Sequence, residues 1–159
     1  MKMTENYKII GSFIKDMSSE TPDTPTYISV RDKISKYKLN IDITSKAVKN
    51  EIIEVNIIIK FSDLPEILKK AYFEITYTSI VKVNEKVSDK KEMEKIILCD
   101  VPNKIYPDLE KIFLNLLTDS GYPGIKFEKK VDFTELYKQR EPKSDGQTLT
   151  PITKYDIPN

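Results

Sequence analysis

The sequence has no histidine, no tryptophan, one cysteine and four glycines in 159 residues. Without histidine, the most common zinc ligand, the usual general base at neutral pH and the Ser-His and Cys-His nucleophile pairs are all missing. Cys99 follows three apolar residues and has no second cysteine to pair with, so we expect a buried thiol in a reducing compartment. With so few glycines there is no glycine-rich phosphate-binding loop. We therefore expect neither an enzyme nor a bound metal or other cofactor.

An excess of charge of one sign is also absent, because 26 basic residues balance 25 acidic ones and leave a net charge of +1. Such a chain has no overall field to attract nucleic acid or an anionic membrane. No segment approaches the roughly 20 apolar residues of a membrane helix. The apolar run at residues 9–14 is too short and too interrupted for the core of a signal peptide. We expect a soluble, unexported protein that binds no nucleic acid and does not insert into a membrane.

The first half of the chain alternates between apolar and polar residues, which is typical of β-strands. Strands are predicted over residues 7–15, 39–44, 53–61 and 71–83, and the short connections between the last three favour an antiparallel meander. Segment 7–15 is apolar on both faces, which indicates that both are at least partly covered. Residues 17–38, with Pro22 and Pro25, form a long connection, and such loops are usually functional or mobile.

The second half has helical periodicity. Asp89 and Asp132 are predicted to begin short helices, and a stronger helix opens within residues 103–107 and ends before Gly121. Strands followed by helices predict an α+β domain over residues 1–140 with helices on one sheet face, and the polar segment 141–159 is predicted to be a flexible tail. The strong helix has a wide apolar stripe that is either ordinary core or an oligomer interface; its members include Leu109, Ile112, Phe113 and Leu116.

Four segments, in consistent order over residues 7–140, resemble the SecB family of protein-export chaperones. The most specific is residues 13–25, Phe-Ile-Lys-Asp-Met-Ser-Ser-Glu-Thr-Pro-Asp-Thr-Pro, which resembles the family signature at the end of the first strand. The others are residues 39–43, residues 102–107, and Gly121 followed by residues 131–137. The resemblance implies a four-stranded antiparallel sheet with a long crossover after the first strand, and a cytoplasmic homotetramer built as a dimer of dimers. It further implies a holdase that keeps unfolded secretory preproteins in apolar grooves and delivers them to SecA.

The resemblance also assigns residues to roles. Binding of SecA is expected at an acidic surface on the outer sheet face, formed by Asp16, Glu20, Tyr72 and Glu74. The candidates for the client-binding groove, each of which could equally be plain core, are Tyr27, Ile28, Val30, Leu39, Ile41, Ile43, Leu136 and Tyr137. Unlike most members of the family, this chain is not clearly acidic.

Three other functions fit parts of the sequence. A SecB-like chaperone could protect the antitoxin of a toxin–antitoxin pair, although the intact set of Asp16, Glu20 and Glu74 favours the export role. A small hydrophobic ligand could bind between sheet and helix. The chain could also be a purely structural oligomer with no affinity for unfolded polypeptides.

Overall fold

The computed structural model describes residues 6–63, 70–127, 130–139 and 153–158. Its elements, in chain order, are β1 (Tyr7–Glu20), α1 (Thr24–Lys33), the short 3-10 helix η1 (Ile34–Lys36), β2 (Lys38–Lys49), β3 (Ile52–Ser62), β4 (Tyr72–Val83), α2 (Lys90–Lys95), the π-helical turn η2 (Ile96–Asp100), α3 (Val101–Asp119), α4 (Phe133–Gln139) and β5 (Thr153–Pro158). The predicted α+β class is confirmed.

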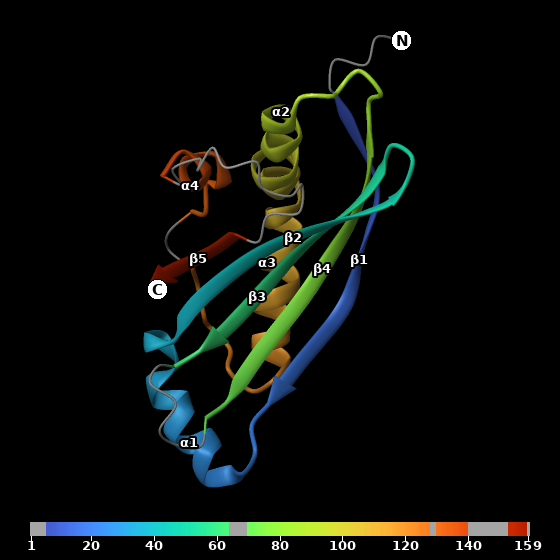
Figure 1. Cartoon of the computed structure of the whole chain (residues 1–159). Helices are drawn as coiled ribbons and strands as arrows, with labels where there is room; N and C mark the ends of the chain where they lie inside the picture. Colours follow the sequence, from blue (N-terminus) through green and yellow to red (C-terminus); the bar gives the residue numbers. More distant parts are fainter. Residues whose placement is uncertain (1–5, 64–69, 128–129, 140–152, 159) are drawn as a thin grey trace.

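All neighbouring strands of the sheet are antiparallel, and their order is β1-β4-β3-β2-β5 (Figure 1). Strands β2, β3 and β4 form a meander, because each pairs with the next. Strand β1 pairs with β4, so the connection through α1 and η1 crosses from β1 to β2 beyond two intervening strands. The sequence predicted four strands, and the fifth comes from the C-terminal segment.

Part of the segment predicted as a flexible tail is a strand. β5 pairs with β2 in a register that runs from Lys38 opposite Pro158 to Ile43 opposite Thr153. The rest of the predicted tail, residues 141–152 and 159, lies outside the described residues. Composition gave no sign of this strand, because a segment that adds to an existing sheet edge needs only backbone groups and not an apolar periodicity.

Strand β1 is longer than predicted and carries two irregularities in its pairing with β4, between Ile9 and Gly11 and between Ile14 and Asp16. A bulge places an extra residue in one strand, so the side chains beyond it change faces. Strict alternation along β1 would place Tyr7, Ile9, Gly11 and Phe13 on one face, but the irregularity after Ile9 puts Gly11 and Phe13 on the other. Strict alternation cannot locate a bulge.

Helix α3 covers one face of the sheet, and the core lies between them (Figure 1). Leu109, Phe113 and Leu117 of this helix are fully buried. Phe61 of β3 lies at the centre of an aromatic cluster, with ring centroids 5.3–6.3 Å from those of Tyr37, Phe73, Phe113 and Phe127. Each such buried ring contributes about 1.5–3 kcal/mol from removal of apolar surface from water.

The helical ends follow the local sequence, with one correction. Gly121 has φ of +101° directly after α3, as predicted for a helix C-cap. Asp132 accepts hydrogen bonds from the backbone of Thr134 and Glu135 at the start of α4. However, α3 begins at Val101, and Pro107 lies inside it rather than in its first turn. The helical segment starts earlier than predicted because the preceding turn, η2, is also helical and packs its apolar side chains into the core. Among the described residues, no helix is long and apolar enough to cross a membrane.

Candidate functional site

The four residues expected to bind SecA lie together on one sheet face. In the pairing of β1 with β4, Glu20 is opposite Tyr72, Ser18 is opposite Glu74 and Asp16 is opposite Thr76. Residues that face each other across an antiparallel pair, and alternate residues along a strand, point to the same side. Phe73 and Ile75, which alternate with Tyr72 and Glu74, are fully buried in the core. Asp16, Glu20, Tyr72 and Glu74, the acidic set, therefore lie on the outer face, away from α3.

The charges of the acidic set act on one another. The Tyr72 hydroxyl donates a hydrogen bond to a carboxylate oxygen of Glu74. The pKa of Tyr72 is raised, and burial is the largest cause. The hydrogen bond to Glu74 and the negative charges of Glu74, Glu20 and Asp16 raise it further. The phenol consequently stays protonated and holds the Glu74 carboxylate in place. Both carboxylates on β1 are exposed to solvent and available to a basic partner.

Lys60 of β3 is a neighbour of the acidic set that sequence reasoning missed. It is opposite Glu74 in the pairing of β3 with β4, and its Nζ lies 3.6 Å from Glu74 Oε1. Lys60 lies at a polar position of the alternating segment 53–61, but only the register between strands brings it beside Glu74. The surface therefore presents three carboxylates and one ammonium group, which weakens but does not cancel its negative field.

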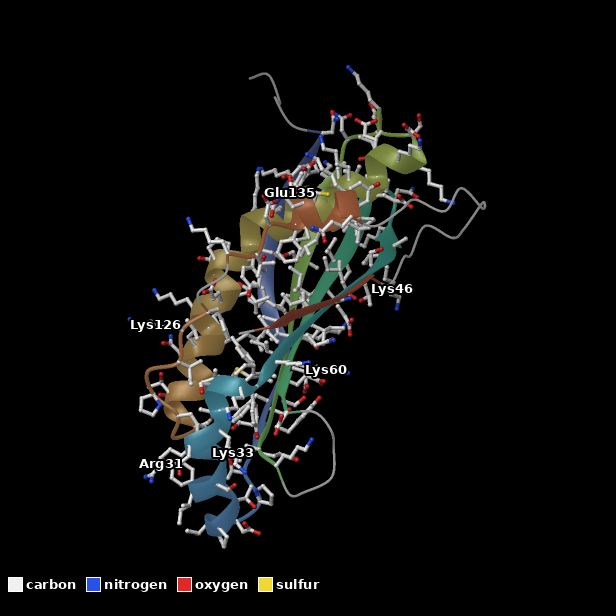
Figure 2. All side chains as sticks on the ribbon, turned by 90° about the vertical axis from the view of Figure 1, so that its left-hand side faces the viewer. Arg31, Lys33, Lys46, Lys60, Lys126 and Glu135 are labelled. Carbon is white, nitrogen blue, oxygen red and sulfur yellow. The ribbon has the colours of Figure 1, made fainter. Side chains whose placement is uncertain are left out.

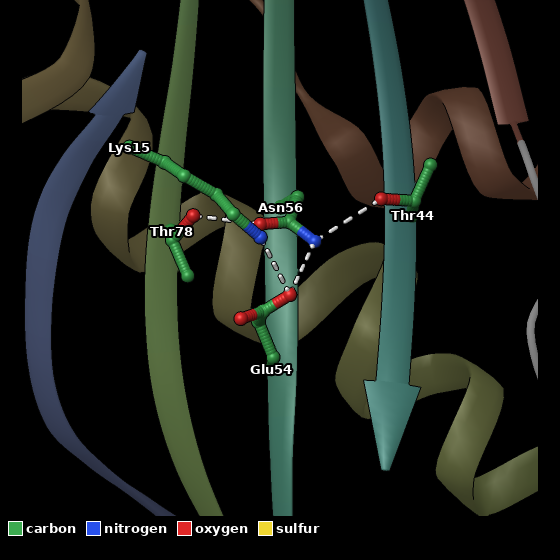
Figure 3. A network of polar contacts seen from close by, with 5 residues as sticks. All are labelled: Lys15, Thr44, Glu54, Asn56 and Thr78. Carbon is green, nitrogen blue, oxygen red and sulfur yellow. Dashed lines mark hydrogen bonds and ion pairs between the residues drawn. The ribbon is translucent and has the colours of Figure 1, made fainter. Parts of the chain in front are cut away.

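A polar network crosses the same outer face nearer the middle of the sheet (Figure 3). Glu54 Oε2 lies 3.1 Å from Lys15 Nζ and accepts a hydrogen bond of 3.1 Å from the Asn56 amide. The Asn56 side chain also accepts a bond from Thr78 at 2.6 Å and donates one to Thr44 at 3.2 Å. The hydrogen bond from Asn56, followed by Lys15, lowers the pKa of Glu54. Because the network joins β1, β4, β3 and β2, a slip of one residue in any pairing would break it.

Strand β1 exposes a set of large apolar side chains. Ile10, Phe13, Ile14 and Met17 are each 42–54% exposed. Within the described residues β1 pairs on one side only, with β4. An edge strand with exposed apolar residues is typical of a surface that meets another chain. The sequence predicted that both faces of this strand are at least partly covered, but the single chain leaves these four side chains exposed.

Four of the eight candidates for the client-binding groove are core residues of the single chain. Val30, Leu39, Ile41 and Ile43 are at most 5% exposed. In the single chain these four side chains belong to the hydrophobic core. This was the other role that the sequence left open for them.

The other four groove candidates are accessible to some degree but lie apart. Ile28 of α1 is 52% exposed, and Tyr27 donates a hydrogen bond of 2.8 Å to the carbonyl of Gly121. Leu136 and Tyr137 of α4 are partly buried, and the Tyr137 hydroxyl donates to Glu94 at 3.2 Å. Helices α1 and α4 lie at opposite ends of the molecule in both views, with Arg31 and Glu135 marking them in Figure 2. One subunit therefore does not join the two pairs into a single surface.

The apolar stripe of α3 divides between core and surface. Leu109 and Phe113 are fully buried in the core of the single chain, which is the other role that the sequence left open for this stripe. Ile112 and Leu116 pack against this core and are only partly buried, so each keeps some accessible apolar surface.

The single cysteine of the chain has no accessible thiol. Cys99 is buried, as predicted, and burial followed by the charge of Asp100 raises its pKa to about 11. A thiol of this kind is protonated at neutral pH and a poor nucleophile. The described residues contain no group of three or more side chains that could hold a metal ion.

Comparison with known proteins identifies the family. The family described as preprotein translocase subunit SecB matches residues 2–144. A putative protein-export protein SecB of Pelagibacter ubique is 91% identical over 138 residues, which cover 87% of this chain and 99% of that protein. Protein-export proteins SecB of Rhodospirillum rubrum and Methylocella silvestris are 27% and 26% identical over 87% and 80% of this chain, and over 84% and 78% of their own lengths. The chain belongs to the SecB family of protein-export chaperones.

Proposed function

We propose that this protein binds unfolded preproteins in the cytoplasm as a holdase and delivers them to SecA for translocation. The observation that carries the delivery step is the acidic set, in which Asp16, Glu20 and Glu74 from two strands lie on one solvent-facing surface. Exposed carboxylates steer a basic partner and contribute modestly to its affinity. The polar network beside this surface holds the strands in register and keeps the carboxylates in fixed relative positions.

The proposed assembly is a homotetramer built as a dimer of dimers. Two apolar surfaces of the subunit support it. One is the exposed set on β1, with Phe13, Ile14 and Met17, and the other is the partly buried pair Ile112 and Leu116 on α3. Contacts between copies would bury both surfaces, which are unusual on a monomer that remains in solution.

Client binding is proposed at the apolar surface that remains accessible, namely Tyr27 and Ile28 on α1 and Leu136 and Tyr137 on α4. The two pairs are separate on one subunit, so a long extended client would contact several of them in succession. Many weak contacts on one assembly reach a high overall affinity without strict sequence preference.

Native mass spectrometry of the protein, alone and mixed with an unfolded polypeptide diluted from urea, tests the holdase and the assembly together. A tetramer that captures the unfolded chain and ignores the same chain once folded is expected. A monomer or dimer that captures nothing would refute both proposals.

Charge reversal tests the SecA surface. In the double variant Glu20→Lys/Glu74→Lys, SecA affinity is expected to fall about tenfold or more at low salt, because two attractions become repulsions. The matched control is Glu85→Lys/Asp108→Lys, which makes the same change of net charge at two exposed acids outside the acidic set. Tetramer mass and client capture should be unchanged in both variants. Equal SecA affinity in the two variants would remove the assignment of this surface.

A further inference from the structure

Strand β2 is covered along one side by the chain's own C-terminal segment. Pairing runs over six consecutive positions, from Lys38 to Ile43 of β2. Without β5, the backbone N–H and C=O groups on this side of β2 would be those of an open sheet edge. The order β1-β4-β3-β2-β5 makes β5 the last strand of the sheet, so its only described partner is β2.

This strand lies outside the part of the chain that its family shares. The family match ends at residue 144, before β5 begins at Thr153. The relative from Pelagibacter ubique is aligned over 99% of its own length but over only 87% of this chain. The strand that covers this edge of β2 therefore comes from a segment outside the family match.

The register is compatible with specific pairing. In the pairing of β5 with β2, Ile157 is opposite Leu39 and Lys154 is opposite Asp42. The attraction that the backbones supply is a ladder of hydrogen bonds, which any extended polypeptide can form equally well.

We propose that β5 is a built-in occupant of the β2 edge and that an extended segment of an unfolded polypeptide displaces it and pairs with β2 in its place. This inference rests on the proposed holdase function and adds to it an autoinhibitory strand. Because β5 belongs to the same chain, its effective concentration at the edge is on the order of millimolar. Weak peptides in solution cannot compete at that level, whereas an unfolded protein that already contacts the apolar surfaces of the assembly can.

The magnitude follows from the population of the open edge. If β5 is paired about 90% of the time, the apparent affinity for an unfolded chain is lowered about tenfold relative to an edge that is always open. A roughly tenfold reduction in affinity is enough for β5 to keep short peptides and the sheet edges of other subunits from pairing with β2. It still permits capture of long clients.

Three variants, each compared with the full-length parent protein, separate the roles of backbone and side chains. The first ends at Gln139 and lacks β5. The second carries Tyr155→Pro and Asp156→Pro; consecutive N–H groups of a strand point to opposite sides, so one of the two prolines removes a donor to β2. The matched control, Tyr155→Thr with Asp156→Thr, changes the same side chains but keeps both donors and a residue type that favours strands.

The probe is reduced, carboxymethylated lactalbumin, which cannot fold, and its affinity is measured by fluorescence anisotropy. The truncated and proline variants are expected to bind it about tenfold more tightly than the parent, and the threonine control within about twofold of the parent. Affinities that are equal among all four proteins would overturn the autoinhibitory role and leave the holdase function intact.

Amide hydrogen exchange of residues 38–43 is measured on the same proteins without any client. Faster exchange in the truncated and proline variants than in the parent and the control supports the pairing, and equal exchange in all four overturns it. If none of the four binds lactalbumin, the holdase proposal fails, and the exchange result still decides whether β5 occupies the edge.

Discussion

Replacing Gly121 by alanine tests the contact between the crossover helix α1 and the turn that follows α3. Gly121 has φ of +101°, a conformation that a residue with a Cβ adopts only under strain. An added Cβ would lie 2.9 Å from Cε1 of Tyr27, closer than such atoms approach in stable structures. Tyr27 also donates a hydrogen bond to the Gly121 carbonyl, and its ring centroid is 5.2 Å from that of Tyr122. One substitution therefore perturbs both the turn after α3 and the contact by which Tyr27 of α1 packs against that turn.

The expected loss can be worked out from these contacts. Backbone strain at a positive φ costs about 1–3 kcal/mol. Moving the Tyr27 ring forfeits a hydrogen bond of about 1 kcal/mol and an aromatic contact of about 0.5–1.5 kcal/mol. Gly124→Ala is the matched control, because Gly124 has φ of +82° but nothing within 4 Å of the added Cβ. Gly121→Ala should therefore cost about 1.5–2.5 kcal/mol more than Gly124→Ala.

Urea denaturation at one fixed protein concentration measures both variants, since the stability of the proposed tetramer would depend on concentration. Introducing Tyr27→Ala should remove the difference between the two glycine variants, because the ring that meets the new Cβ is then gone. If Gly121→Ala is no more destabilising than Gly124→Ala, or if the difference survives in the Tyr27→Ala background, the described packing of α1 on this turn is wrong.

Three further predictions concern polar and ionisable groups. The hydrogen bond from Asn56 lowers the pKa of Glu54 in the folded protein below its usual value of 4.5. The ionised Glu54 side chain therefore stabilises the fold above pH 4.5, and this stabilisation is lost as the pH falls through the pKa of the folded state. In urea titrations Glu54→Gln should thus destabilise the protein at about pH 7 but match the parent near pH 3, and a pH-independent difference would contradict this. Asn103→Ala should cost about 1–2 kcal/mol and speed amide exchange in α4, because its side chain accepts the backbone N–H of Phe133 at 3.0 Å; Asn103→Asp, which keeps the acceptor, should cost less. Cys99 should react with a thiol reagent at about pH 8 roughly 100-fold more slowly in the folded protein than in urea, since burial raises its pKa to about 11; similar rates would refute its burial.

The acidic set shows how far sequence could go toward the site. Glu74 and Tyr72 fall on the polar positions of a clearly alternating strand, so their face was predictable from residues 71–83 alone. Asp16 and Glu20 lie beyond two bulges of β1, where alternation is unreliable, and only the resemblance to SecB indicated that they belong to the same surface. The register of β1 on β4 is what brings the two pairs together. Lys60 illustrates the same limit, since its partner is decided by the pairing of two strands and not by its neighbours in sequence.

The burial of the groove and interface candidates could not be predicted from the sequence for a related reason. An apolar residue on a strand or helix is predicted to be buried, but sequence does not say whether its own subunit or another covers it. Ile41 and Phe113 are covered within the chain, whereas Ile28 and Met17 are exposed, although all four are equally apolar by type. The number and position of helices packed on each sheet face decide between these outcomes.

Alternation, helical periodicity and turn residues are properties of near neighbours, and these by themselves determined the α+β class, the meander, the C-cap at Gly121, the start of α4 and the burial of Cys99. The family was determined in the same way, by short motifs in a consistent order. Only the tertiary structure decided four other features: the bulges, the cross-strand partners, the addition of β5 to β2, and the division of apolar residues between core and surface. Each of these depends on contacts between segments far apart in the chain, where packing and backbone pairing outweigh local preference.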